Sequence, residues 1–442
     1  KLGGKIGLNL SKKAIFGWHK LNKNKLGFPW IEDLSSKRLI NLLYNYEYIN
    51  SASKEDDRKK LDFIIYFHIQ RILFDFKSKK ISEFTSYDLK AYLLSCSLLK
   101  KISESEIDYI KYIVDNQIDK IGMHKSYNFL EHSKFINNLS EIKNILLFSK
   151  SNKSNVFDEV ILKMTSILNE YFHLDGSLAL FNGTNNVYTI NIYKSLNKEN
   201  YLKKREFSNI NNGIAFYSDK NKKIFFDVVQ PNSDMISSNL SAGTLSIELS
   251  GFGEKIITNC GASESFGKNP EYLRYSAAHS TIILQNTNIS EIKESNPHIK
   301  FPQSVTFDTS INNLDCVYEG SHNGYQKKFN KIIKRKINVK KDTNFINGED
   351  SIINVTRENI KVIYHIRFHL VSGIAFNFTN NKKNIILRTK SNNMWLFKSD
   401  VELIVEDSII VDRNTTVETK QIVIKGITNN NKVLRKWSLE KI

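Results

Sequence analysis

The hydrophobic pattern changes its period near Phe172, and this change constrains the fold more than any other feature of the sequence. From about Leu34 to Phe172, apolar residues recur every three or four positions, as in "EDDRKKLDFIIYFHIQRILFDF", a spacing typical of amphipathic helices. In "SESEIDYIKYIVDNQIDKI", Ser103 and Glu106 have capping-box spacing and predict a helix start. The apolar residues that follow predict one buried helix face: Ile107, Ile110, Val114, Ile118 and Ile121.

After "HLDGSLALFNGTNN" the apolar residues alternate with polar ones. The segment "GIAFYSDKNKKIFFDVV" predicts a hairpin around Asp-Lys-Asn, and "GTLSIELSGFGEKIITNC" predicts another around Gly251 and Gly253. Later segments continue this alternation without helices between them, which indicates a large antiparallel sandwich. We therefore predict an α+β multidomain chain, with a helical domain over 1–175 and a β-sandwich over 176–442. No phosphate loop or dinucleotide fingerprint occurs in the sequence.

The formal net charge of +18 has two interpretations. It favours a polyanionic partner such as an acidic polysaccharide, a nucleic acid or a membrane surface. Alternatively, positive residues such as those in "KKFNKIIKRKINVKK" occupy the solvated faces of strands. Nucleic-acid binding is disfavoured because the sequence lacks any zinc finger, helix-turn-helix or aromatic RNA-binding signature. No apolar run approaches the roughly 20 residues that a membrane-spanning helix needs, and three separated cysteines form no metal-type spacing.

Several short motifs, taken in order, resemble the heparinase II/III-like family of polysaccharide lyases, and most closely its proteobacterial branch. The motifs are "HLDGSLALFNG", "LSAGTLSIELSGFGEKIITNCGA", "RYSAAHSTIIL", "HNGY", "FINGEDSI", "RFHL" and "KQIVIKG". The resemblance covers the sandwich half almost end to end and the helical half more loosely. It implies an N-terminal (α/α) toroid, a C-terminal β-sandwich and a sugar-binding cleft between them.

The resemblance also implies a reaction, the β-elimination of uronic-acid polysaccharides. A base removes the proton at C5 of the uronate and the glycosidic oxygen at C4 leaves. The C5 proton becomes acidic only when the neighbouring carboxylate is neutralised, so the site needs hydrogen-bond donors or a cation there. It also needs a base and an acid within hydrogen-bonding reach, commonly Tyr and His.

The family's zinc positions match this chain incompletely. His279 in "AAHST" occupies one zinc-ligand position, but the Asp position of the preceding strand falls at Asn259. The family's HxH-like stretch falls at "NLSAG", which places Asn239 and Ser241 where histidines are usual. Neutral Asn and Ser oxygens are poor zinc ligands beside imidazole and carboxylate. We therefore expect no bound cofactor and disfavour zinc at the degenerate positions Ser241, Asn259 and His279.

On the helical side, "GMHKSYNFLEHSKFINN" resembles the family's catalytic stretch. His124 matches the histidine that follows the glycines, and the usual Tyr position falls near Glu131. Tyr127 and His132 lie within a turn of that position, so Tyr127, His132 and His124 are the predicted acid and base groups. A structural role is the alternative for each, because a Tyr at a helix start is more often structural and a histidine can simply be solvated.

The remaining predicted site residues come from the sandwich and its approach. Asn239 is predicted to steady the substrate carboxylate, and His279 either takes part directly or fills the core as a hydrogen-bonded imidazole. Arg367 and His369 share one strand face and form either a polar pocket or a wet surface; we favour a structural role. His322 and Tyr325 are assigned no chemistry. The residues predicted to bind substrate are Glu131, Asp175, Ser241 and Arg274.

Two functions remain open at this stage. The first is a polysaccharide lyase that acts on an acidic glycan in the cleft. The second is a non-catalytic glycan-binding or cell-envelope assembly protein on the same scaffold, which the incomplete zinc positions favour. The resemblance suggests residence in the cell envelope or periplasm, although the first residues lack a signal-peptide core and do not begin with Met. That start is consistent with a fragment or a processed product, and the sequence does not determine the oligomeric state.

Overall fold

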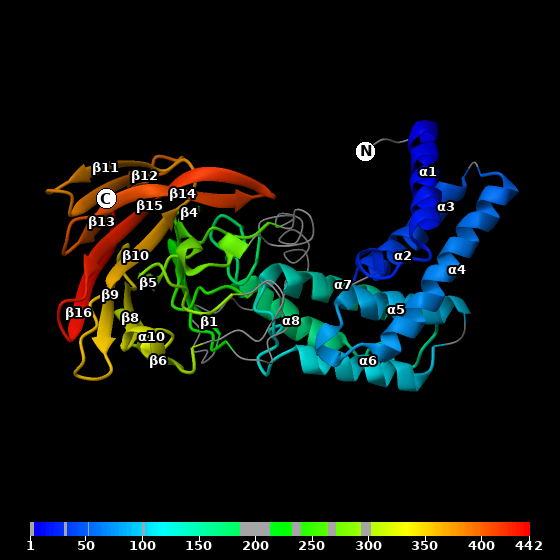
Figure 1. Cartoon of the computed structure of the whole chain (residues 1–442), viewed down its shortest axis with the longest axis horizontal. Helices are drawn as coiled ribbons and strands as arrows, with labels where there is room; N and C mark the ends of the chain where they lie inside the picture. The colour runs from blue at the N-terminus through cyan, green and yellow to red at the C-terminus, as the bar shows by residue number, and fades with distance from the viewer. Residues whose placement is uncertain are drawn as a thin grey trace. The chain divides into compact units, whose positions relative to one another are not determined.

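The structure is a computed structural model in which helices occupy the first part of the chain and strands the second (Figure 1). It divides into two compact units. The first comprises Lys1–Gly122 and Ser133–Met164, and the second comprises Met123–His132 and Thr165–Ile442. The residues that the structure describes are 4–30, 33–51, 53–99, 102–185, 213–231, 240–263, 271–292 and 302–442.

The helices match the three-to-four-residue spacing of apolar residues in the sequence. The boundary between the two units passes through two helices, α7 and α8. The α-helices before the strands are α1 (Gly4–Asn22), α2 (Leu34–Tyr44), α3 (Tyr46–Asn50), α4 (Glu55–Ser78), α5 (Ser86–Leu99), α6 (Glu104–Gln117), α7 (Phe129–Phe148) and α8 (Asp158–Glu170). Short 3-10 turns occur at η1 (Phe28–Trp30) and η2 (Ile81–Glu83).

Helix α6 shows how far the local pattern determines an element. The capping box is confirmed: the Ser103 side chain accepts a hydrogen bond from the Glu106 backbone, and the Glu106 side chain accepts one from the Ser103 backbone. The predicted face is buried at Ile107, Ile110 and Val114. The predicted extent is wrong at the other end, because Ile118 is the C-cap and adopts an extended conformation, so neither Ile118 nor Ile121 is helical.

The second unit contains two antiparallel sheets of eight strands each among the described residues. The first runs in the order β1-β2-β3-β4-β10-β15-β14, with β5 paired to β10. Its strands are β1 (Ile214–Ser218), β2 (Lys222–Asp227), β3 (Ile247–Gly251), β4 (Glu254–Thr258), β5 (Ile282–Leu284), β10 (Ile363–Leu370), β14 (Ile404–Asp412) and β15 (Thr415–Ile427). Both hairpins predicted from the sequence are present, as β1–β2 and β3–β4.

The second sheet runs in the order β11-β12-β13-β16-β9-β8-β7-β6. A short helix, α10 (Gln326–Phe329), precedes β8, and two 3-10 turns, η4 (Glu271–Leu273) and η5 (Ser276–Ala278), precede β5. The strands are β6 (Val305–Ile311), β7 (Asp315–His322), β8 (Lys331–Lys340), β9 (Phe345–Asn354), β11 (Ala375–Thr379), β12 (Asn384–Arg388), β13 (Met394–Ser399) and β16 (Lys432–Lys441). The predicted order of helices followed by antiparallel sheets is confirmed (Figure 1).

One apolar core joins residues of both sheets. It contains Phe368 and Ile422 from the first sheet and Ile337 and Trp437 from the second. Strand β8 alternates between buried and more exposed residues, so one of its faces packs into this core and the other meets solvent. All three cysteines are free and buried.

A charged pair lies fully inside the sandwich. Arg335 of β8 and Asp350 of β9 are directly opposite in register, and both side chains are completely buried. The guanidinium donates to both carboxylate oxygens, at 2.6 and 3.0 Å. The other guanidinium nitrogen, Nη1, donates to the backbone oxygens of Leu245 and Ser280, at 2.9 and 2.8 Å. This ion pair therefore ties the second sheet to the loop before β3 and to the residue that follows His279.

Candidate functional site

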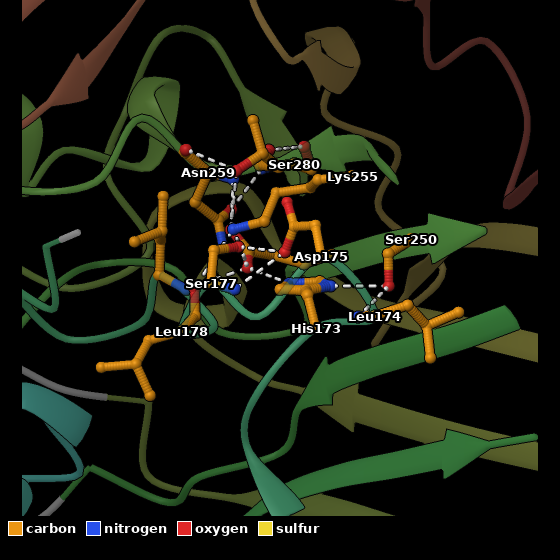
Figure 2. A network of polar contacts seen from close by, with 12 residues as sticks. His173, Leu174, Asp175, Ser177, Leu178, Ser250, Lys255, Asn259 and Ser280 are labelled. Atoms are coloured by element: carbon orange, nitrogen blue, oxygen red, sulfur yellow. Dashed lines mark hydrogen bonds and ion pairs between the residues drawn. The ribbon is translucent and has the colours of Figure 1, made fainter. Parts of the chain in front are cut away.

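The second unit contains a buried polar network centred on Glu248 of β3. Figure 2 shows this network with His173, Lys255 and Asn259 labelled. One carboxylate oxygen accepts hydrogen bonds from Thr258 Oγ1, at 3.0 Å, and from the Asn259 backbone, at 2.7 Å. The other accepts from the Leu180 backbone, at 2.9 Å, and from His173 Nε2, at 2.8 Å. Since Glu248 is fully buried, these donors replace the water that its charge would otherwise need.

The charges in this network are balanced by Lys255 of β4. Its Nζ atom lies 3.6 Å from Glu248 and donates to the backbone oxygen of Leu178 at 3.1 Å. Burial alone would raise the pKa of Glu248, but the charge of Lys255 and the hydrogen bond from His173 lower it to about 2. Burial, reinforced by Lys255, lowers the pKa of His173 to about 4, so this imidazole is neutral at pH 7. Its Nδ1 atom can then accept a hydrogen bond from Ser250 Oγ, at 2.9 Å.

His279 stands directly after η5 and is 3% exposed. A Cβ atom at Gly243 would lie 3.0 Å from Cγ of the His279 ring, so the absence of a side chain at Gly243 makes room for this ring. Within the described residues, neither ring nitrogen has a hydrogen-bond partner. Burial lowers the pKa of His279 to about 4, which leaves the ring neutral at pH 7. It can therefore donate one hydrogen bond and accept another.

Ser280 connects His279 to the Glu248 network. Its backbone nitrogen donates to Asn259 Oδ1 at 2.9 Å, and its hydroxyl donates to the Thr258 backbone oxygen at 2.7 Å. The same hydroxyl accepts a hydrogen bond from the His369 backbone, at 2.9 Å. The backbone next to His279 is therefore fixed by strands β4 and β10.

The three positions that correspond to zinc ligands do not make a zinc site. Asn259 Oδ1 already accepts from Ser280, and the Asn259 amide nitrogen has no partner in the part of the chain that the structure describes. Ser241 supplies a neutral hydroxyl, so His279 is the one strong zinc ligand of the three. No group of three or more His, Cys, Asp or Glu residues suited to a metal occurs among the described residues. This donor set does not fit zinc.

The predicted residues of the helical side belong to Met123–His132, a segment of the second unit. His124 Nδ1 lies 2.8 Å from Ser126 Oγ, and burial lowers the pKa of His124 to about 4. The His124 backbone donates to His132 Nδ1 at 3.1 Å. Tyr127 is buried and adopts a left-handed backbone conformation with φ of 49°, which is strained for a residue with a side chain. Glu131 lies half-buried in the first turn of α7.

Separate hydrogen bonds join this segment, the loop that contains Ser241 and the start of η5 to neighbouring parts of the second unit. The Phe129 backbone donates to Thr184 Oγ1 at 2.9 Å, and the Ser241 backbone donates to Asn182 Oδ1 at 3.4 Å. Ser276 Oγ donates to the Ala242 backbone oxygen at 2.7 Å, close to the start of η5. These contacts place the segment and His279 on connected parts of the same unit.

Three further residues predicted from the sequence, Asn239, Arg274 and Asp175, lie in different surroundings. Asn239 lies outside the described residues. Arg274 is buried and its Nε atom donates to the Leu240 backbone oxygen at 3.0 Å, so it braces a loop. Asp175 is exposed and accepts from the backbone and hydroxyl of Ser177, at 2.8 and 2.7 Å. Figure 2 shows Asp175 close to Lys255 at the edge of the network.

Comparison with known proteins identifies the family. The family model described as "Heparinase II/III-like, C-terminal" matches residues 205–438, which is more than half of the chain. The chain belongs to the heparinase II/III-like family. No curated protein matches it in sequence.

Solved structures extend this heparinase-like likeness to the helices. A "heparinase III" gene product has a TM-score of 0.72 at 12% identity, covering 100% of this chain and 72% of its own. A second heparinase III has a TM-score of 0.71 at 12% identity, with coverages of 98% and 74%. A mutant of the heparan sulfate lyase HepC from Pedobacter heparinus has a TM-score of 0.66 at 12% identity, with coverages of 98% and 73%. At these identities the likeness shows the fold.

Sequence reasoning missed the three charged or polar residues that organise the buried network, which are Glu248, His173 and Lys255. Glu248 is an acidic residue in a strand whose neighbours, Ile247 and Leu249, are both buried. His173 precedes the Asp-Gly turn, and Lys255 follows the Gly-Phe-Gly turn. A charged residue in an otherwise apolar strand is the signal that would have identified Glu248, because such residues are buried only with partners.

Proposed function

We propose that the protein is a polysaccharide lyase that cleaves an acidic, uronic-acid-containing glycan by β-elimination. The observation that carries this proposal is membership of the heparinase II/III-like family together with a heparinase III fold over nearly the whole chain. In the same proposal the helices form an (α/α) toroid, and the protein belongs to the proteobacterial branch and resides in the cell envelope or periplasm. The net charge of +18 suits a polyanionic substrate.

The tautomer of His132 limits the part that this ring can take in the proposed reaction. Its Nδ1 atom accepts a hydrogen bond from the His124 backbone, so a neutral ring carries its proton on Nε2. Such a ring donates at Nε2 and does not accept there. In this proposal Tyr127, as phenolate, removes the C5 proton and, as the phenol so formed, returns it to the leaving C4 oxygen. His132 keeps its own proton and stabilises the leaving oxygen by a hydrogen bond from Nε2. The strained backbone of Tyr127 supports a functional role, because such conformations cluster at active sites.

In this proposal, uncharged hydrogen-bond donors stabilise the negative charge of the substrate carboxylate. Asn239 and His279 are the proposed donors, and His279 has ring nitrogens without partners among the described residues. A neutral imidazole stabilises the developing charge at C5 and the carboxylate by donating a hydrogen bond. No step is assigned to zinc, since the donor set of Ser241, Asn259 and His279 does not fit it.

A second candidate is a non-catalytic glycan-binding or cell-envelope assembly protein on the same scaffold. The burial of His279, which is 3% exposed, favours it, because a deeply buried ring has little access to substrate. The amide and hydroxyl at Asn259 and Ser241 favour it as well. In this case the Glu248 network is a structural support for a binding surface.

The deciding experiment measures the ultraviolet absorbance of the unsaturated uronate on a panel of acidic polysaccharides. The lyase proposal expects new absorbance from at least one polymer, with a loss of about 100-fold or more in Tyr127→Phe and His132→Gln. Tyr109→Phe, at an exposed tyrosine of the first unit, is the matched control and should retain activity. Polymer binding without any gain in absorbance across the panel would favour the second candidate.

A further inference from the structure

A pocket of about 790 Å³ lies on the sandwich and is not used by the proposed elimination. Its floor comes from β10, β14 and β15, which are adjacent strands of the first sheet (Figure 1). Its wall comes from the segment before His279, including Tyr272 and Tyr275. Pockets of about 300–1,000 Å³ are the usual size for small-molecule sites, so this one has room for a ligand of one or two sugar rings.

The strand register places two polar side chains together on the floor. His369 of β10 is directly opposite Gln421 of β15, and Gln421 is directly opposite Glu406 of β14. The chain neighbours Phe368 and Ile422 belong to the core between the sheets. Since successive side chains of a strand alternate between faces, His369 and Gln421 lie on the outer face of the first sheet. Both line the pocket.

Gln421 offers a hydrogen-bond acceptor at this floor. Its side chain is buried, at 7% exposure, and its Nε2 atom donates to the Asp407 backbone oxygen at 3.0 Å. This hydrogen bond orients the side-chain amide of Gln421. The Oε1 atom of Gln421 has no hydrogen-bond partner among the residues that the structure describes. A buried acceptor without a partner is unfavourable, and a ligand hydroxyl would satisfy it.

Two further lining groups, His369 and Cys260, are polar but uncharged; the nearby charges of Arg367 and Glu406 are paired with each other at 2.9 Å. His369 Nδ1 lies 2.7 Å from Ser408 Oγ and 3.7 Å from Cys260 Sγ. Burial lowers the pKa of His369 to about 3 and raises that of the Cys260 thiol to about 12. Both groups are therefore neutral at pH 7.

The rim carries an excess of negative charge. Lys420 is paired with Asp407, and Glu418 adds a second carboxylate to the lining. This local balance is opposite in sign to the net charge of the chain, and it repels an anionic ligand. Tyr272 is 50% exposed beside this rim, so its ring offers an apolar face to a sugar.

We propose that this pocket binds a neutral sugar unit of a glycan. Gln421 Oε1 accepts a hydrogen bond from a sugar hydroxyl, Tyr272 packs against the apolar face of the ring, and Glu418 discriminates against uronates. Tyr127, His132 and His279 do not line the pocket, so in this proposal it binds glycan without taking part in the elimination. It does not depend on that chemistry, because a lyase and a non-catalytic scaffold could both use it.

The test is ligand-observed NMR with the whole chain and individual trisaccharides: maltotriose, cellotriose, triacetylchitotriose and trigalacturonate. We expect at least one neutral trisaccharide to bind at this pocket. Trigalacturonate that binds at the elimination site should bind equally well to the pocket variants. Gln421→Ala and Tyr272→Ala should each weaken the neutral sugar by about tenfold or more, the effect of one lost hydrogen bond or packing contact. Gln326→Ala, at a half-buried glutamine of α10, is the matched control.

A second variant tests the pocket with a surface substitution that should not disturb the fold. Glu418 is exposed, so Glu418→Lys should leave the fold intact and increase the affinity for trigalacturonate at this pocket. The proposal is overturned if no neutral trisaccharide binds, if Gln421→Ala and Tyr272→Ala weaken trigalacturonate more than every neutral sugar, or if both variants bind the neutral sugars as the control does. The absorbance assay for elimination is independent of each of these results.

Discussion

At the scale of single residues, the candidate site depends on small groups that leave space for larger ones. The ring of His279 packs where Gly243 has no side chain, with Cγ, Nδ1 and Cδ2 all within 3.3 Å of an added Cβ. Because His279 is almost completely buried, its ring has little freedom to move aside. The orientation of this imidazole is therefore decided by the residue at position 243.

Replacing Gly243 by Ala should destabilise the second unit by about 1–3 kcal/mol, the range for inserting a methyl group into a packed interior. If the lyase proposal is correct, the displaced ring should also lower activity. The measurement is a urea titration with the two units fitted separately, together with the absorbance assay. Gly17→Ala is the matched control: an added Cβ at this α1 position meets no atom within 4 Å. It should stabilise the helix by about 0.5–1 kcal/mol. Equal effects of the two changes would contradict this argument.

At the scale of elements, one ion pair holds two strands and two loop segments together. Arg335 and Asp350 face each other across β8 and β9, and the Trp437 indole of β16 donates to Asp350 at 3.0 Å. The remaining guanidinium nitrogen reaches Leu245 and Ser280, which belong to the first sheet and its connections. A buried pair of this kind specifies how the two sheets are aligned, because each donor has one available acceptor geometry.

Arg335→Met should cost about 3–5 kcal/mol, because it leaves the Asp350 carboxylate buried without a counter-charge. The double variant Arg335→Met/Asp350→Leu should recover much of this loss, since both buried charges are then removed. Lys334→Met is the control on the same strand. Lys334 is a half-buried partner of Glu319 at the surface, and a surface pair contributes about 0–1 kcal/mol. Chemical denaturation measures all three, and a double variant no more stable than Arg335→Met would refute the argument.

At the scale of the whole molecule, buried histidines make the second unit sensitive to acid. Burial lowers the pKa of His124, His173 and His279 to about 4, and that of His322 and His369 to about 3. In the unfolded chain these rings titrate near 6.5. Between these values the unfolded state binds more protons than the folded state, so stability falls as pH decreases. Above about pH 6.5 the rings contribute no pH dependence.

We expect the free energy of unfolding to decline progressively between about pH 6.5 and 4. Asp227, whose pKa burial raises to about 7, holds a proton in the folded state over this range and offsets about one of these histidines. Each proton taken up on unfolding contributes a slope of about 1.4 kcal/mol per pH unit. Below about pH 4.5, Glu248 adds to the loss, because its folded pKa of about 2 lies beneath its usual value. His322→Gln should reduce the number of protons taken up on unfolding by about one, which lowers the slope by about 1.4 kcal/mol per pH unit. An unchanged slope in that variant, or a gain in stability on acidification, would contradict the assignment of these buried neutral rings.

Across the whole molecule, the local signals of the sequence predicted the elements but not all the roles of the site residues. The period change, the capping box of Ser103 and Glu106, and the two hairpins with turns near Asp219 and Phe252 are local signals, and the structure confirms them. The ordered motifs indicated the family, which the match over residues 205–438 shows. The acid and base roles of Tyr127, His124 and His132 remain predictions. The role of Asn239 also remains one, because that residue lies outside the described part of the chain.

The sequence by itself determined the type and order of the elements, since an amphipathic pattern records which face of one helix or strand is buried. Only the tertiary structure decided which buried faces meet. Glu248 draws partners from His173 and Lys255, and His369 lies opposite Gln421, because the strand order brings β4, β10 and β15 side by side. No local pattern carries that information: hydrogen bonds and charge pairing act through space between residues far apart in the chain.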